Sequence, residues 1–189
     1  MSVDKSAPHR FEPGPFGLAV LFFAARLVTL IGTPQDALAG FGDFWNFFHL
    51  AEIEGLPFIH YWVEFPPVFP FLSEALYLAA HQQEHVYNYL LSFILALANA
   101  GGVYFFVRID ERLNLQEHRV RSYWMALILL ALPYSHTYFD PLAVFFMMSS
   151  LWLILCEKNT AAGFLAALGG LTKLFPLLAV AALWGKNWR

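Results

Sequence analysis

Apolar runs separated by short polar segments dominate the chain. The clearest runs are 16–31 and 86–107, each near the roughly 17–25 residues that a helix needs to cross a bilayer. Pro34 follows the first run, and Arg108 ends the second. Further apolar runs, from which we expect shorter helices, cover 123–138, 142–156, 161–171 and 174–184. The pattern predicts an all-α, polytopic membrane protein with about six transmembrane helices.

Two weaker helical patterns lie between the clear runs. In 43–54, polar residues recur every three positions opposite an aromatic side, which is typical of an amphipathic helix in the membrane interface. The polar positions are Asp43, Asn46, His49 and Glu52, and the apolar ones are Phe44, Phe47, Phe48 and Ile53. The segment 68–81 follows Pro66-Pro67 and has Glu74, Tyr77 and His81 on one face. It predicts either a short span or a second interfacial helix.

The distribution of Lys and Arg favours the interfacial alternative for 68–81. No Lys or Arg occurs between Arg26 and Arg108, whereas 108–121 carries four arginines. Loops rich in Lys and Arg stay cytoplasmic, and 108–121 lies on that side only if 68–81 does not cross. We therefore expect a multi-pass protein of the cell membrane with a cytoplasmic N-terminus. Its single domain, 1–189, divides into a cytoplasmic tail (1–15), an outer loop with interfacial helices (33–85), a cytoplasmic basic loop (108–121) and the remaining spans.

Composition agrees with the membrane class. The chain is 59% hydrophobic and 13% charged, whereas a soluble domain is about 25% charged. The net charge is −3 and no basic patch with interleaved aromatic residues occurs, so we expect no nucleic-acid partner.

The last two apolar runs, 161–171 and 174–184, predict two short helices in preference to one helix kinked at Pro176, because a single helix would carry Lys186 and Arg189 outside.

In this topology, polar residues converge on the outer face. Asp43 opens the first interfacial helix, and His60 and Glu64 precede Pro66-Pro67. Asp140 and Lys173 form a pair at the outer ends of two helices. Arg26 lies inside the first span, where a buried cation needs a carboxylate or phosphate partner. The candidate site residues are Asp43, His60, Glu64, Asp140, Lys173 and Arg26.

The segments around these residues resemble the GT-C superfamily, integral-membrane glycosyltransferases that use polyprenyl-phosphate sugars. In 42–72 the similarity lies in Asp43, the turn Gly55-Leu56-Pro57-Phe58 and the run Glu64-Phe65-Pro66-Pro67. In 160–180 it lies in a small-residue helix that leads to Lys173-Leu174-Phe175-Pro176. The nearest branch is the polyprenyl-phosphate-mannose-type transferases. The resemblance implies interfacial helices in the first outer loop and a lipid-linked sugar, such as mannose, as donor.

The resemblance gives Asp43 the role of the base that accepts the proton of an acceptor hydroxyl in an inverting transfer. A departing phosphate needs cations or a metal. Lys173 and Arg26 are the available cations, and the need for a divalent metal stays open. Structural alternatives stand beside these roles: Asp43 as a helix cap, Glu64 as the partner of Arg26, and Lys173 as a side chain extended to the interface. Asp140 either caps the helix at Pro141 or neighbours Lys173.

Relatives in this superfamily usually continue with further spans after the Lys-x-Phe-Pro segment, whereas the sequence stops at Arg189. We therefore expect a GT-C-like transferase or its N-terminal part, with another membrane subunit as a possible source of the missing helices. The alternative is a non-catalytic membrane subunit with a GT-C-derived scaffold that binds lipid or partner membrane proteins. A small transporter is less well supported, because no internal pseudo-symmetry is evident.

Overall fold

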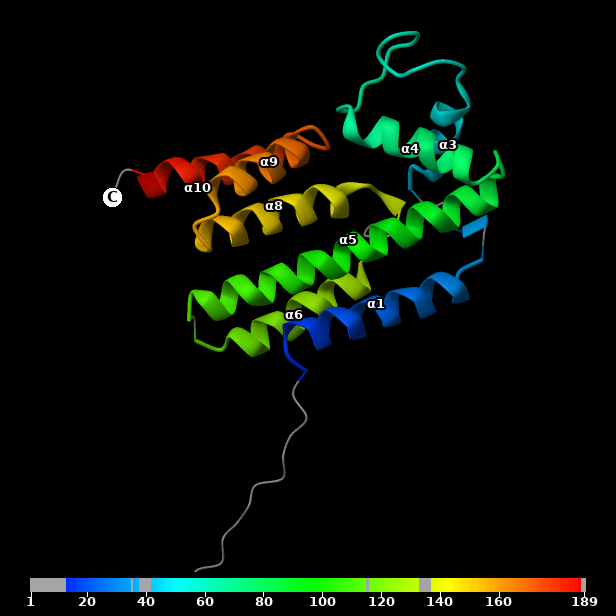
Figure 1. Ribbon diagram of the computed structural model, residues 1–189. Coiled ribbons are helices and arrows are strands. Elements are labelled where there is room, and N and C mark those ends of the chain that lie inside the picture. The colour runs from blue at the N-terminus through cyan, green and yellow to red at the C-terminus, as the bar shows by residue number, and fades with distance from the viewer. Residues whose placement is uncertain (1–12, 35, 38–41, 115, 133–136, 188–189) are drawn as a thin grey trace, which may run out of the picture.

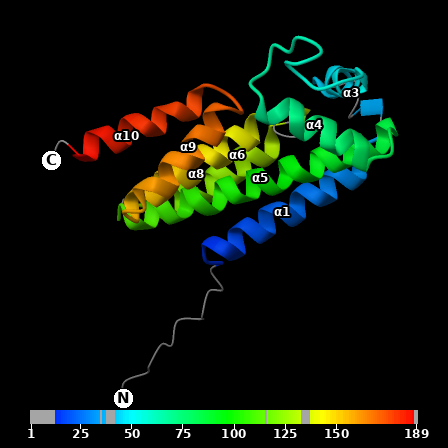
Figure 2. The same cartoon turned by 45° about the horizontal axis from the view of Figure 1, so that its top comes forward.

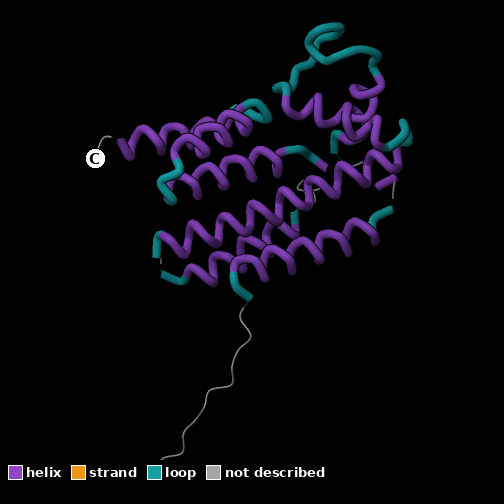
Figure 3. Tube along the Cα trace, in the orientation of Figure 1, coloured by secondary structure: helices purple, strands orange, loops and turns teal. Residues whose placement is uncertain are grey.

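The computed structural model describes residues 13–34, 36–37, 42–114, 116–132 and 137–187. Over these ranges the chain forms helices and connecting loops, with an isolated bridge between Pro57 and Tyr61 but no β-strand (Figure 3). The long helices lie side by side in a bundle and alternate in direction along the chain (Figure 1). They are α1 (Pro15–Gly32), α5 (Glu84–Arg112), α6 (His118–Ala131), α8 (Asp140–Leu155) and α9 (Asn159–Gly170). The expected all-α class is confirmed for the described residues.

Two of the described helices are long and apolar enough to cross a membrane. Helix α1 has 18 residues and α5 has 29, which gives lengths of about 27 and 43 Å at 1.5 Å per residue. Helices α8, α6 and α9 have 16, 14 and 12 residues and are shorter than a usual span. Two helices therefore satisfy the criterion of length and composition, and membrane crossing by these and the other expected helices stays a prediction.

The expected basic loop 108–121 is mostly helical. Helix α5 continues through Arg112 and α6 begins at His118, so the connection is 113–117. Buried Asp110 accepts a 2.7 Å hydrogen bond from Arg121, which ties the end of α5 to the start of α6. Helix α6 also ends at Ala131, before the limit that hydropathy suggested. Apolar runs therefore predict the middle of α5 and α6 better than their charged ends, where Asp110 and Arg121 form an ion pair.

Helices α3 (Phe44–Glu52) and α4 (Val68–Ala79) pack together at one end of the bundle. Helix α3 exposes Asn46, His49 and Glu52, as the pattern predicts. The helix is shorter than the predicted 43–54: it ends at Glu52, and Ile53 is its C-cap and is 46% exposed. Helix α4 is about 18 Å long, too short for a ~30 Å hydrocarbon core. Both helices contribute to a core cluster of Phe44, Phe47, Phe48, Phe69, Ala80, Tyr87, Leu91, Leu95 and Phe139.

The last part of the chain forms two short helices, as expected. After α9 the chain reverses through 171–174 and a 3₁₀ turn (Phe175–Leu177) into α10 (Leu178–Asn187), which lies beside α8 and α9 (Figure 2). Gly169 permits this reversal, because a Cβ there would lie 2.6 Å from the Cβ of Pro176. The small residues at the end of α9 thus allow the Lys-x-Phe-Pro segment to fold back closely.

Candidate functional site

An open cavity of about 560 Å³ lies beside the start of α3. Asp43, at the start of α3, and Glu64, in the loop 53–67 between α3 and α4, both line this cavity. No Lys or Arg belongs to its described lining, which consists of Asp43, Asn46, Leu50, Trp62, Val63, Glu64 and Phe65. We call it the acidic cavity. Two of the predicted site residues therefore share one site.

Asp43 occupies the N-cap position of α3, but its side chain does not cap the helix. Its Oδ1 accepts a 3.3 Å hydrogen bond from the Asn46 amide, and its backbone N–H donates to the Thr137 carbonyl at 3.4 Å. Gly42 allows this close approach: its φ is +105°, and a Cβ there would lie 2.5 Å from Thr137 Cβ. The N-cap expectation is thus correct for position, while the carboxylate lines the acidic cavity.

Arg26 and Glu64 lie in different environments and form no ion pair in the described structure. Arg26 is fully buried, donates to the carbonyl of Leu129, and has its guanidinium 5.4 Å from the Phe22 ring centroid. Glu64 is exposed at the acidic cavity. The proposed pairing is therefore wrong, and Arg26 is held within the bundle by the backbone of α6 and an aromatic ring.

His60 lies in the loop outside the acidic cavity. Its Nδ1 accepts the backbone N–H of Leu56 at 2.8 Å, which fixes the turn of the Gly-x-Pro-Phe segment. Tyr61 donates from its hydroxyl to the Leu50 carbonyl at 3.4 Å. Partial burial, and secondly the charge of Glu74, raise the pKa of Tyr61, so its hydroxyl stays a neutral donor at physiological pH. These residues support the cavity wall.

A second cavity, of about 490 Å³, lies between α5, α6 and α8. Its lining is mostly apolar and includes Asn99, Gly102, Met125, Leu129, Leu132, Tyr138, Asp140, Pro141, Val144 and Lys173. We call it the apolar cavity. Lys173 Nζ donates to Asp140 Oδ1 at 2.5 Å, which confirms the predicted pair. Of the two alternatives for Asp140, the structure shows the contact with Lys173. The N-cap of α8 is Phe139, and Asp140 lies in the first turn of this helix.

Aromatic rings connect the walls of the two cavities. Phe65 lines the acidic cavity, and its ring meets Phe139 edge-on with centroids 5.4 Å apart. The ammonium of Lys173 lies 5.1 Å from the centroid of the same Phe139 ring. The Val68 N–H also donates to the Leu171 carbonyl at 2.9 Å, which holds the Pro66-Pro67 corner against the turn before Lys173. The two sequence motifs therefore meet in space.

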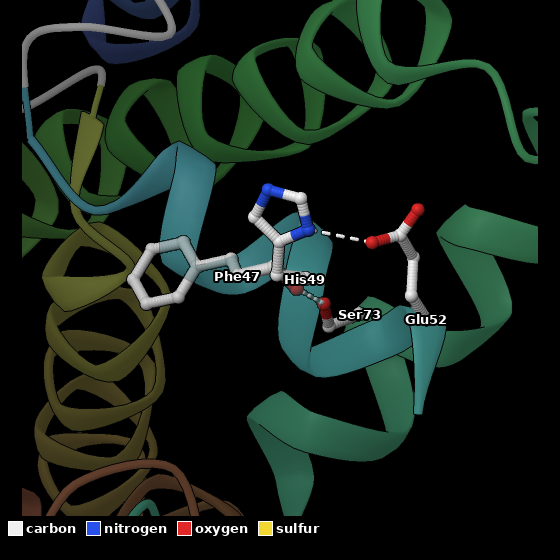
Figure 4. A network of polar contacts seen from close by, with 4 residues as sticks. All are labelled: Phe47, His49, Glu52 and Ser73. Atoms are coloured by element: carbon white, nitrogen blue, oxygen red, sulfur yellow. Dashed lines mark hydrogen bonds and ion pairs between the residues drawn. The ribbon is translucent and has the colours of Figure 1, made fainter. Parts of the chain in front are cut away.

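Figure 4 shows how α3 is fixed against its neighbours. Ser73 of α4 donates to the Phe47 carbonyl at 3.3 Å and lies 2.5 Å from the Tyr87 hydroxyl of α5. On the exposed side of α3, His49 Nδ1 lies 2.5 Å from Glu52. The sequence analysis did not predict a role for Ser73, because it considered only the polar face of 68–81 that contains Glu74. The spacing of four residues between Phe69 and Ser73 places both on one face of a helix and so indicates that Ser73 is buried with Phe69.

The described residues contain no group of three His, Cys, Asp or Glu side chains arranged to hold a metal ion. Comparisons with protein-family models, with curated proteins and with solved structures each find no match to this chain. Function is therefore argued from the two cavities and from the motifs that build them.

Proposed function

We propose that this chain is a GT-C-like glycosyltransferase, or the N-terminal part of one, that transfers a sugar from a polyprenyl-phosphate donor to an acceptor hydroxyl at the outer membrane face. The observation that carries the proposal is the contact of Phe65, which lines the acidic cavity, with the buried Phe139, whose ring lies beside Lys173 at the edge of the apolar cavity. An apolar cavity suits a polyprenyl chain, a cation at its edge suits the phosphate, and a carboxylate suits an acceptor hydroxyl.

The membrane setting is part of the proposal. Helices α1 and α5 are long enough to cross, and we assign α6, α8, α9 and α10 as further, shorter spans with α3 and α4 interfacial. Pro13, Glu111 and Arg119 line one small cavity, so the start of α1 shares an end of the bundle with the 113–117 turn. The arginines near that turn make this end cytoplasmic under the positive-inside rule. The acidic cavity then faces outside.

The proposed reaction inverts the configuration at the anomeric carbon of the sugar. The acceptor oxygen forms a bond to that carbon while its proton passes to the Asp43 carboxylate. The bond from the anomeric carbon to the phosphate oxygen breaks, and its electron pair leaves with the phosphate. Lys173 stabilises the negative charge of the leaving group. Mannose is the sugar that the family resemblance favours.

The test is exchange of Asp43 for Asn, which removes the base and keeps the shape of the side chain. In lipid vesicles with polyprenyl-phosphate mannose and a membrane extract as the source of acceptor, we expect release of polyprenyl phosphate to fall at least 100-fold. Glu52→Gln is the matched control, because Glu52 is an exposed carboxylate of α3 outside the cavity lining. Equal release by the Asp43→Asn variant and the wild type would remove Asp43 from the mechanism.

A second candidate is a non-catalytic membrane subunit that binds a lipid phosphate or partner membrane proteins. It is favoured by the Lys173–Asp140 pair, because an ammonium already engaged by a carboxylate is a weaker stabiliser of a leaving group. This candidate predicts Lys173-dependent binding of polyprenyl phosphate by the wild type without release of phosphate from the donor. It also predicts co-purification with other membrane proteins.

A further inference from the structure

The loop between α3 and α4 presents an apolar surface away from the helices. Residues 55–62, here the 55–62 loop, stand to one side of the bundle, between α3 and the start of α4 (Figures 1 and 2). The side chains of Leu56, Ile59 and Trp62 are 44%, 69% and 85% exposed. Exposed apolar residues gathered at one projecting turn indicate an interaction surface.

The 55–62 loop is held by its own hydrogen bonds. The N–H of Phe58 donates to the Tyr61 carbonyl at 2.9 Å, and the N–H of His60 donates to the Leu56 carbonyl at 3.0 Å. Gly55 has a φ of +106°, and a Cβ there would lie 2.7 Å from His60 Cβ. The backbone thus fixes the direction of the apolar side chains, and most of the ordering cost is met before any partner binds.

We propose that the 55–62 loop inserts its apolar side chains into the outer leaflet of the bilayer. The inference rests on the membrane setting of the proposed function, although not on sugar transfer. A turn placed beside spanning helices meets lipid, and Trp is enriched at the membrane interface. Internal hydrogen bonds also satisfy the backbone at Phe58 and His60, as a lipid environment requires.

The charges near the 55–62 loop specify the kind of lipid surface. Glu52 and Glu54 are exposed beside it, and no Lys or Arg lies between Arg26 and Arg108. The loop itself therefore offers no Lys or Arg to anionic head groups, and its insertion depends on apolar contact. We expect the loop to insert fully into a zwitterionic bilayer.

Insertion has a consequence for the acidic cavity. Trp62 belongs to both the exposed surface of the 55–62 loop and the cavity lining, and Glu64 follows two positions later. The depth of Trp62 in the leaflet therefore sets the height of the cavity relative to the head groups.

The test places an environment-sensitive NBD fluorophore on Ile59→Cys in a Cys156→Ser background, with the full chain in phosphatidylcholine vesicles. Ile59 lies outside the acidic cavity. We expect a blue-shifted emission, with quenching by nitroxide-labelled lipid at least threefold stronger than quenching by aqueous iodide. Glu54→Cys is the matched water-facing control. Val28→Cys on α1, where Val28 is 70% exposed, reports the membrane setting itself.

The outcomes separate the two levels of inference. Lipid quenching at positions 28 and 59, with iodide quenching at 54, supports insertion. Lipid quenching at 28 with iodide quenching at 59 overturns insertion and leaves the membrane setting intact. Iodide quenching at both 28 and 59 overturns the membrane setting and insertion with it. Protection of position 59 from both quenchers overturns insertion in favour of a protein contact.

Discussion

The ammonium group of Lys173 lies 2.5 Å from the carboxylate of Asp140, a residue 33 positions earlier in the chain. The two side chains remain 40% and 44% exposed, so the ion pair contributes about 1 kcal/mol or less to stability. Its larger consequence is positional. The pair keeps a cation at the edge of the apolar cavity, 5.1 Å from the centroid of the Phe139 ring.

Exchange of Lys173 for Met should weaken binding of polyprenyl phosphate at least 10-fold, because it removes the cation and keeps the apolar stem. The free energy of unfolding should change by about 1 kcal/mol or less. Titration of the lipid phosphate in detergent, followed by native mass spectrometry, measures the affinity. Lys173→Arg should retain most binding, and Lys158→Met, near the opposite end of α8, should retain all of it. Unchanged affinity in the Lys173→Met variant would assign the phosphate to another group.

Exchange of Gly42 for Ala should displace Asp43. The φ of Gly42 is +105°, and the added Cβ would lie 2.5 Å from Thr137 Cβ, so strain of about 1–3 kcal/mol is expected. Sugar transfer per folded molecule should fall together with the melting temperature. Gly163→Ala is the matched control, since a Cβ at Gly163 would meet no heavy atom within 4 Å and α9 should gain from a better helix former. Transfer at the wild-type level by the Gly42→Ala variant would show that this turn does not position the carboxylate.

Much of the fold follows from apolar periodicity. The limits of α1 differ by one residue from the run 16–31, and the amphipathic pattern of 43–54 gives the buried face of α3. The ends of α5 and α6 were harder to predict, because charged residues such as Asp110 and Arg121 indicate a loop in the sequence, and only the structure shows the ion pair between them. The ion pair joins residues of two consecutive helices that lie 11 positions apart, a contact that no pattern within either helix reveals.

The candidate site was predictable in part for a related reason. Charge and motif order placed Asp140 beside Lys173, and Asp43 and Glu64 in one outer loop. The prediction of a Glu64 partner for Arg26 failed because its position within an apolar run does not reveal which carbonyl or ring lies opposite it. Thr137 was missed because its contribution is a backbone carbonyl, and sequence patterns of side chains carry no information about such a contact.

The Ser73–Tyr87 contact should couple α4 to α5. Tyr87 is fully buried, and its hydroxyl lies 2.5 Å from Ser73 Oγ. Ser73→Ala leaves that hydroxyl without its partner and should cost about 1–3 kcal/mol, whereas Tyr87→Phe removes the hydroxyl itself and should cost about 1 kcal/mol. The double variant should therefore lose less stability than the sum of the single variants. Thermal unfolding of the four proteins in one detergent measures the coupling, and simple additivity would contradict it.

The Asp110–Arg121 pair should hold the 113–117 turn. The Asp110 side chain is 5% exposed and accepts two hydrogen bonds from Arg121, at 2.7 and 3.3 Å. Arg121→Ala leaves a buried carboxylate without this partner, and we expect a loss of about 1–3 kcal/mol, smaller than the ~3–5 kcal/mol for a fully buried pair. The reason is that the Arg121 side chain is 43% exposed. Exposed Arg112→Ala should change stability by no more than about 0.5 kcal/mol. Equal unfolding midpoints for the two variants would mean that water replaces Arg121 at the carboxylate, and that the turn is held by helix packing alone.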